Sequence, residues 1–204
     1  MIILPHLYAI MDAACFENKS TFLAYTEELM AGGVTLLQYR NKSDNASAML
    51  EQARELKRQA GPRVKLIMND RADLCIAAEF DGVHLGQDDL SPEGARGVIG
   101  DKLWLGVSTH NPNQLKVADA TTADYVAIGP VFSTSSKRNP DPVIGLEGVR
   151  KARTLTRKPL VAIGGITRTN CRSVIEAGAD SVAVISDLLS EPRKSAEEFF
   201  RVLR

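Results

Sequence analysis

Eight short segments rich in Val, Ile and Leu recur along the chain at spacings of roughly 20 to 30 residues. A stretch with helical character follows each one, which is the alternation of a parallel sheet with its connecting helices. Several segments are apolar throughout, as strands covered on both faces are. They are LYAIMD from Leu7, TLLQYR from Thr35, KLIMND from Lys65, GVHLGQ from Gly82, WLGVST from Trp104, YVAIGPV from Tyr125, LVAIGGI from Leu160 and SVAVISD from Ser181.

The intervening stretches carry helix signals. Apolar residues repeat at steps of three and four from Ala46 to Ala60, and Gly61-Pro62 then supplies a stop. Ser91-Pro92 and Asn111-Pro112 each offer an N-cap followed by proline. Eight such units without a linker predict a single domain over residues 1–204, an α/β fold of the (β/α)8 barrel type. A doubly wound open sheet shares the local pattern, but the count of eight favours a closed barrel.

Composition and charge narrow the function classes. The 25 basic and 25 acidic side chains leave a net charge of +0, so no long-range positive field would gather nucleic acid or an anionic membrane. No apolar run reaches membrane-spanning length and no signal peptide is evident, which makes the cytoplasm the expected compartment. Cys15, Cys75 and Cys171 lie far apart outside any metal spacing, and we interpret them as reduced packing residues.

The second segment ends in a basic cluster. Alternation along the strand places Gln38 and Arg40 on the barrel interior, with Leu37 and Tyr39 toward the helices and Lys42 at the rim. Functional residues of such barrels gather at the carboxyl ends of the strands. A guanidinium, an ammonium and an amide at one strand end can hold an anion, although a solvated loop would have the same composition.

Carboxylates end the third and fourth segments. If those strands are neighbours, Asp70 and Asp89 lie close enough to share one divalent cation. Ligation by oxygen alone favours Mg²⁺, since no His/Cys cluster suited to zinc is present. Asn69-Asp70 and Asp88-Asp89 would also suit turns, so each pair taken singly is ambiguous.

The later segments suggest a lid and a phosphate site. The hydroxyl-rich loop after the sixth segment, residues 133–142, is predicted to be an exposed lid that carries Lys137. Glycines 164 and 165, with the residues that follow Val184, lie in the last two units, where barrels often bind a phosphate through backbone N–H groups. The roles of His84 and His110 stay open, and His6 is expected at the surface.

Taken in order and spacing, the motifs QYRNK, MNDRADL, DGVHLGQDDL, GVSTH, DYVAIGPVFSTSSK, VAIGGIT and ADSVAVISDLL resemble the thiamine phosphate synthase family over nearly the whole chain. The resemblance implies a (β/α)8 barrel and a Mg²⁺-dependent transferase of thiamine biosynthesis. Its small-molecule substrates would be hydroxymethylpyrimidine diphosphate and thiazole phosphate, and its products thiamine phosphate and pyrophosphate. Pyrophosphate would leave early, and the thiazole nitrogen would attack the resulting pyrimidine methylene cation.

The resemblance also implies residue roles. The metal would lie on Asp70 and Asp89, and the catalytic set would be Arg40, Lys42, Ser108 and Lys137. Substrate-binding residues, several of which are also catalytic, would be Gln38, Arg40, Lys42, Asn69, Ser108, Thr134, Ser136, Lys137, Gly165, Ile185 and Ser186.

This chain departs from the family pattern in the lid, where Ser133 replaces a proline and Ser136 a threonine. Two alternative readings exist. A thiazole tautomerase of the same fold would account for His110 but has no need of a diphosphate site. A catalytically silent phosphate-binding barrel would be favoured if one of the diphosphate-site residues were missing. The sequence leaves the oligomeric state open, a homo-oligomer included.

Overall fold

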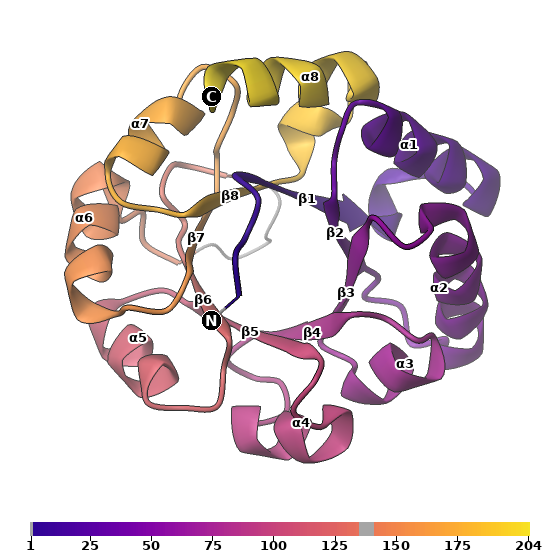
Figure 1. Cartoon of the computed structure of the whole chain (residues 1–204), viewed down its shortest axis with the longest axis horizontal. Coiled ribbons are helices and arrows are strands. Elements are labelled where there is room, and N and C mark those ends of the chain that lie inside the picture. The colour runs from indigo at the N-terminus through magenta and orange to yellow at the C-terminus, as the bar shows by residue number, and fades with distance from the viewer. Residues whose placement is uncertain (1, 135–140) are drawn as a thin grey trace.

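In the computed structural model, which describes residues 2–134 and 141–204, eight parallel strands close into a barrel in sequence order (Figure 1). Closure is direct, because Leu7 of the first strand pairs with Val182 of the last. The predicted (β/α)8 barrel is therefore confirmed. The strands are β1 (Leu7–Asp12), β2 (Leu36–Arg40), β3 (Lys65–Asn69), β4 (Gly82–Leu85), β5 (Trp104–Thr109), β6 (Tyr125–Ile128), β7 (Leu160–Ile163) and β8 (Ser181–Val184).

Helices form the outer ring, one after each strand (Figure 1). The predicted caps are present: the side chains of Ser91 and Asn111 accept backbone N–H groups of the helices that begin at Pro92 and Pro112. The helices are α1 (Lys19–Ala31), α2 (Ala46–Ala60), α3 (Ala72–Ala77), α4 (Pro92–Ile99), α5 (Pro112–Asp119), α6 (Gly145–Leu155), α7 (Cys171–Glu176) and α8 (Pro192–Val202), with short 3-10 turns η1 (Ala13–Cys15) and η2 (Ser186–Leu188).

Alternation along each strand divides the core in two. Outward residues such as Leu37 and Tyr39 pack under the helices, as predicted. Inward residues such as Tyr8, Ile67 and Val161 fill the barrel itself. Each large side chain buried in this way contributes about 1.5–3 kcal/mol to folding. Toward the carboxyl ends of the strands the inward positions become polar, so the barrel opens into a site at that end.

The amino-terminal end of the barrel is held by a repeated polar contact. Asp81, Asp124 and Asp180 directly precede β4, β6 and β8, and each carboxylate accepts a backbone N–H from the preceding strand at 2.7–3.0 Å. Each also pairs with a basic side chain of α2, α4 or α6. We call each aspartate with its basic partner a base clamp; the pairs are Asp81–Lys57, Asp124–Arg96 and Asp180–Arg153.

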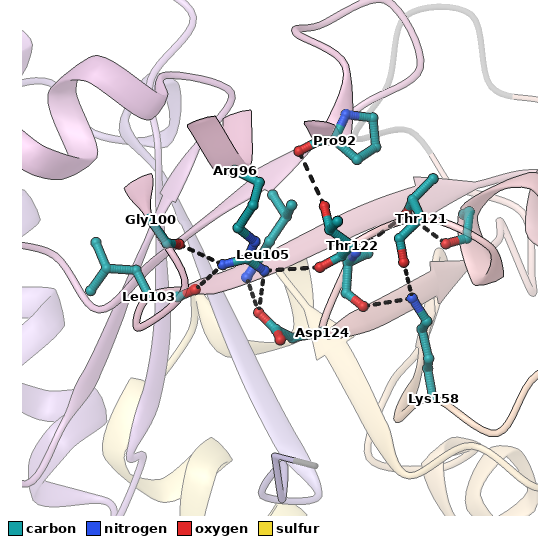
Figure 2. A network of polar contacts seen from close by, with 11 residues as sticks. Pro92, Arg96, Gly100, Leu103, Leu105, Thr121, Thr122, Asp124 and Lys158 are labelled. Carbon is teal, nitrogen blue, oxygen red and sulfur yellow. Dashed lines mark hydrogen bonds and ion pairs between the residues drawn. The ribbon is translucent and has the colours of Figure 1, made fainter. Parts of the chain in front are cut away.

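The clamp around Arg96 is the most extensive of the three (Figure 2). Its guanidinium donates to the carbonyls of Gly100, Leu103 and Thr122 and to the carboxylate of Asp124, all at 2.8–2.9 Å. One side chain thus joins α4, the turn before β5 and the turn before β6.

The N-terminal segment crosses the same end of the barrel (Figure 1), where Leu4 joins the interior cluster. Cys75 and Cys171 are buried as expected, but the expectation for Cys15 is wrong. Cys15 is exposed because it ends the 3-10 turn after β1, above the barrel rim rather than within the core. No helix in the described ranges has the length and apolar character needed to cross a membrane.

Candidate active site

A cavity of about 530 Å³ lies at the carboxyl ends of the strands. Every sequence-predicted site residue that the structure describes lines it: Gln38, Arg40, Lys42, Asn69, Asp70, Asp89, Ser108, Thr134, Gly165, Ile185 and Ser186. Ser136 and Lys137, and most of the predicted lid, fall outside the described residues. Residues from distant parts of the sequence therefore converge on one place, as the barrel topology requires.

The basic residues of β2 are paired with carboxylates. Arg40 donates to Asp12, which ends the neighbouring strand β1, and Lys42 donates to Asp70. Asp12 was not among the predicted site residues, because a single aspartate at a strand end resembles a cap. It does cap η1, accepting the Ala14 N–H at 3.1 Å. Both cations are thereby held at the rim of the cavity.

The two predicted metal ligands touch each other. Burial, followed by the interaction with the neighbouring Asp70 carboxylate, raises the pKa of Asp89. The backbone N–H of Gly86 donates to Asp89 at 2.6 Å and partly offsets the effect. Asp70 has a φ of +63°, the left-handed region, and its N–H donates to the His84 carbonyl at 2.8 Å. Backbone strain of this kind is typical of functional sites.

This pair suits a cation. A carboxylate whose pKa is raised by a second carboxylate beside it gains from a positive charge placed between the two. Within residues 2–134 and 141–204 no group of three or more His, Cys, Asp or Glu side chains could hold a metal ion. A divalent ion here would thus have two protein carboxylates and open positions for other oxygens.

Asn69 presents a donor without a partner. Its side chain is buried, and among the described residues its amide nitrogen has no hydrogen-bond partner. A buried donor left unsatisfied costs about 1–3 kcal/mol, so its persistence beside a cavity indicates a place for a ligand acceptor.

The ends of β7 and β8 form the opposite wall. Gly165 has a φ of +62°, and a Cβ atom there would collide with the backbone of Ser133 and the side chain of Phe132. Glycine thus lets this turn lie against the loop that follows β6. Ile185 and Ser186 begin η2 on the adjacent strand end. The lining of this wall includes glycines and a serine and no charged side chain, a composition that suits a phosphate held by backbone N–H groups.

Four buried groups on the cavity floor form a hydrogen-bonded chain to Ser108. Gln38 Nε2 donates to the Tyr8 hydroxyl at 2.8 Å, and the Tyr8 and Tyr125 hydroxyls lie 3.1 Å apart. His84 Nδ1 lies 3.0 Å from the Tyr125 hydroxyl, and its Nε2 lies 2.8 Å from Ser108 Oγ. Burial lowers the pKa of His84 to about 4, so the ring is neutral at pH 7.

Sequence reasoning missed both tyrosines, since aromatic residues within strands are usually core. The only available signal was their inward register beside Gln38 and His84.

His110 lines the cavity too, with Nδ1 2.7 Å from the Gly129 carbonyl and 3.5 Å from the Asp141 carboxylate. Because a carbonyl oxygen can only accept, His110 Nδ1 carries a proton and donates it to Gly129, a contact that holds the ring in place.

Comparison with known proteins decides the family. The family model for thiamine monophosphate synthase matches residues 7–188. The chain belongs to this family. It is 64% identical over 203 residues to the thiamine-phosphate synthase of Koribacter versatilis. This match covers 98% of this chain and 96% of that protein. The resemblance read from the motifs is thereby confirmed.

Other thiamine-phosphate synthases agree. That of Chloroflexus aurantiacus is 43% identical over 187 residues, covering 90% of this chain and 85% of its own length. Among solved structures, the thiamine phosphate pyrophosphorylase of Pyrococcus furiosus superposes with a TM-score of 0.83 at 33% identity, covering 97% of this chain and 94% of that one. The match therefore extends over both sequence and fold.

Proposed function

We propose that this chain, acting as one catalytic unit, joins hydroxymethylpyrimidine diphosphate to thiazole phosphate and releases pyrophosphate, giving thiamine phosphate. Membership of the synthase family supports the reaction. The observation that carries the residue assignment is the meeting of a carboxylate pair and two cations at one cavity: Asp70, Asp89, Arg40 and Lys42.

The diphosphate would bind at the rim beside β2 and β3. Arg40 and Lys42 would donate to its oxygens, and the Asn69 amide would find there the acceptor that it lacks. Asp12 and Asp70 hold the two cations close to this position before a ligand arrives, which lowers the entropic cost of binding.

Asp70 and Asp89 would hold magnesium, a role supported by their closeness and by the raised pKa of Asp89, which shows that a negative charge there is disfavoured without a further cation. When bound there, it would neutralise charge on the diphosphate and on the departing pyrophosphate. The protein's own contribution is to hold the leaving anion with Arg40 and Lys42. The aminopyrimidine delocalises the positive charge left on its methylene carbon, so no general base is required.

The thiazole phosphate would occupy the opposite wall. Backbone groups near Gly165, Ile185 and Ser186 would bind its phosphate, with Thr134 alongside, while Ser108 would contact the pyrimidine. This placement directs the thiazole nitrogen toward the pyrimidine methylene carbon across the cavity. The roles proposed for Ser136 and Lys137 rest on motif position.

Substrate omission tests the proposal. Purified protein with Mg²⁺ is incubated with both precursors, with thiazole phosphate alone and with pyrimidine diphosphate alone, and all products are followed by chromatography. We expect thiamine phosphate only when both precursors are present. Conversion of the thiazole alone would indicate a tautomerase, and binding of both precursors without turnover would indicate a silent barrel; either outcome would overturn the proposal.

A further inference from the structure

With Gln38 Nε2 facing Tyr8, the hydrogen-bonded chain on the cavity floor has a single direction that satisfies all its members. We call Gln38, Tyr8, Tyr125, His84 and Ser108 the floor relay. We propose that this relay fixes the Ser108 hydroxyl as a hydrogen-bond donor into the cavity, with Tyr8, Tyr125 and His84 acting as positioning residues. The inference rests on the proposed function, in which Ser108 contacts the pyrimidine.

The direction begins at Gln38. An amide nitrogen can only donate, so the Tyr8 oxygen accepts from Gln38 Nε2. The hydroxyl proton of Tyr8 then needs an acceptor, and its other contact is the hydroxyl of Tyr125. If Tyr125 donated to Tyr8 instead, the buried Tyr8 proton would lack a partner among the described contacts.

The direction continues through the imidazole. Because the Tyr125 oxygen accepts from Tyr8, its own proton is donated to His84 Nδ1. A neutral imidazole that accepts at Nδ1 carries its proton on Nε2, and this N–H donates to Ser108 Oγ. Since Ser108 Oγ accepts there, its hydroxyl proton is available to a ligand in the cavity.

This direction affects ligand choice. A hydroxyl at residue 108 with its proton free favours an unprotonated ring nitrogen, such as those of an aminopyrimidine, to which it can donate, over the exocyclic amino group, for which it has only its second lone pair. The reverse direction, with the Gln38 carbonyl oxygen facing Tyr8, would turn the Ser108 proton toward His84 and reverse that preference. The relay would thus favour, through Ser108, the ring orientation that places an unprotonated nitrogen against this hydroxyl.

The surroundings keep each member in its required protonation state. Tyr8 and Tyr125 are fully buried, and burial raises the pKa of both phenols, so they retain their protons. Gly106 makes the contact between Tyr125 and His84 possible, since a Cβ atom at this position would collide with the Tyr125 hydroxyl and His84 Nδ1.

The tautomer of His84 tests the relay without any turnover. The chain has 3 histidines, so ¹⁵N-labelled imidazole spectra are simple, and His84→Gln assigns the signal of interest. We expect the neutral Nε2–H tautomer in the wild-type protein and a mixture of tautomers in Tyr125→Phe. A wild-type Nδ1–H tautomer, or a tautomer that Tyr125→Phe leaves unchanged, would overturn the proposal.

Tyr25→Phe is the matched control. The Tyr25 hydroxyl is also buried, but within the described residues it has no hydrogen-bond partner, so its removal breaks no bond. We expect the His84 spectrum to be the same in this variant as in the wild type. A change as large as that in Tyr125→Phe would attribute the effect to general repacking and overturn the relay.

Ligand binding provides the functional readout. Tyr8→Phe and Tyr125→Phe should each weaken binding of the pyrimidine diphosphate about five- to tenfold, the effect of one lost hydrogen bond, and leave inorganic pyrophosphate binding unchanged. In a Ser108→Ala background the tyrosine changes should have no further effect. Equal weakening of both ligands, or additive losses, would contradict the proposal. The tautomer result stands even if the protein fails to make thiamine phosphate, so the two failures are distinguishable.

Discussion

At the scale of single residues, the contact between Asp70 and Asp89 opposes folding and favours a bound cation. The raised pKa of Asp89 means that its ionised form is disfavoured in the folded protein. This cost is present above the raised pKa and disappears as the pH falls through it, because protonation relieves the contact. Without a bound metal ion, ionised Asp89 therefore lowers the stability of the folded protein at the neutral pH where the enzyme is expected to work.

Replacing Asp89 by Asn should stabilise the metal-free protein and disable the metal site. At pH 7 without Mg²⁺ we expect the melting temperature of Asp89→Asn to rise by roughly 2 °C, since the charge repulsion is removed and the amide oxygen can still accept the Gly86 N–H. Thermal melts with and without Mg²⁺ test this. The metal should raise the melting temperature of the wild type more than that of the variant.

Asp88→Asn is the matched control, because Asp88 is an exposed neighbour in the same loop. We expect its melts to resemble those of the wild type under both conditions. Destabilisation of metal-free Asp89→Asn at pH 7 would show that Asp70 and Asp89 do not repel each other.

The sequence predicted individual residues well where register alone decides their position. Gln38, Arg40 and Asn69 reach the cavity because they occupy inward positions near strand ends. It could not predict which charges pair: the contacts of Arg40 with Asp12 and of Lys42 with Asp70 depend on the barrel's strand register and on side-chain packing. Tyr8 and Tyr125 were missed because inward strand residues are usually apolar packing.

At the scale of elements, the base clamps join successive β-α units at the end of the barrel opposite the cavity. Because the base clamps stabilise the amino-terminal end of the barrel, the carboxyl end can carry a strained backbone and repelling charges. This division between a stabilising end and a functional end is typical of the architecture. Each clamp ties a helix to the turn before a strand two units along, so its loss should weaken the barrel without altering the site.

Arg96→Met should destabilise the protein by about 2–3 kcal/mol, because it removes the guanidinium that donates to three carbonyls and neutralises Asp124 (Figure 2). Denaturant unfolding measures this. The free energy of unfolding of Arg96→Lys should fall between those of the wild type and Arg96→Met, since an ammonium keeps the charge but cannot form the same fork of bonds.

Arg172→Met serves as its control. Among the described residues, the Arg172 side chain forms one exposed pair, with Glu176 in α7, and such pairs contribute about 0.3–0.5 kcal/mol. A loss in Arg96→Met no larger than in Arg172→Met would contradict the role of the base clamp.

The Asp81 clamp predicts a pH dependence. Burial opposes ionisation of Asp81, but the Leu66 N–H, Lys65 and Lys57 outweigh it and lower its pKa. A lowered pKa gives stability that is present above the unfolded value, about 3.9, and is lost as the pH falls through the folded value. Asp81→Asn should therefore melt roughly 2–4 °C lower at pH 7 and approach the wild type in acid.

Melting curves between pH 3 and pH 7, with Asp101→Asn as an exposed control, would check the sign. A melting difference between Asp81→Asn and the wild type that stays constant over this range would assign the effect to packing rather than charge.

Element positions followed from the hydrophobic period, and the differences lie at the strand ends. The predicted segments from Gly82, Tyr125, Leu160 and Ser181 run two or three residues beyond the strands. Several of these extra residues lie past the last ladder pair and line the cavity, as Gly129 and Ile185 do. Sequence pattern reports burial, and burial continues past the last ladder hydrogen bond.

At the scale of the whole molecule, closure of the barrel is what assembles the site. β1 pairs with both β2 and β8, so Arg40 at the end of β2 and Ile185 just after β8 line the same cavity. The count of eight units indicated this closure from sequence. The internal hydrogen-bond direction of the floor relay could not be predicted, because it depends on contacts among five different strands.

Product stoichiometry as a function of Mg²⁺ tests the central claim most directly. Thiamine phosphate and pyrophosphate are quantified in parallel from both precursors, for the wild type and for Asp89→Asn. We predict equal amounts of the two products, formed by the wild type in proportion to bound Mg²⁺, with the variant needing far more metal for the same rate. A folded wild-type protein that forms neither product, or forms both at an unchanged rate after Mg²⁺ is chelated, would contradict the account.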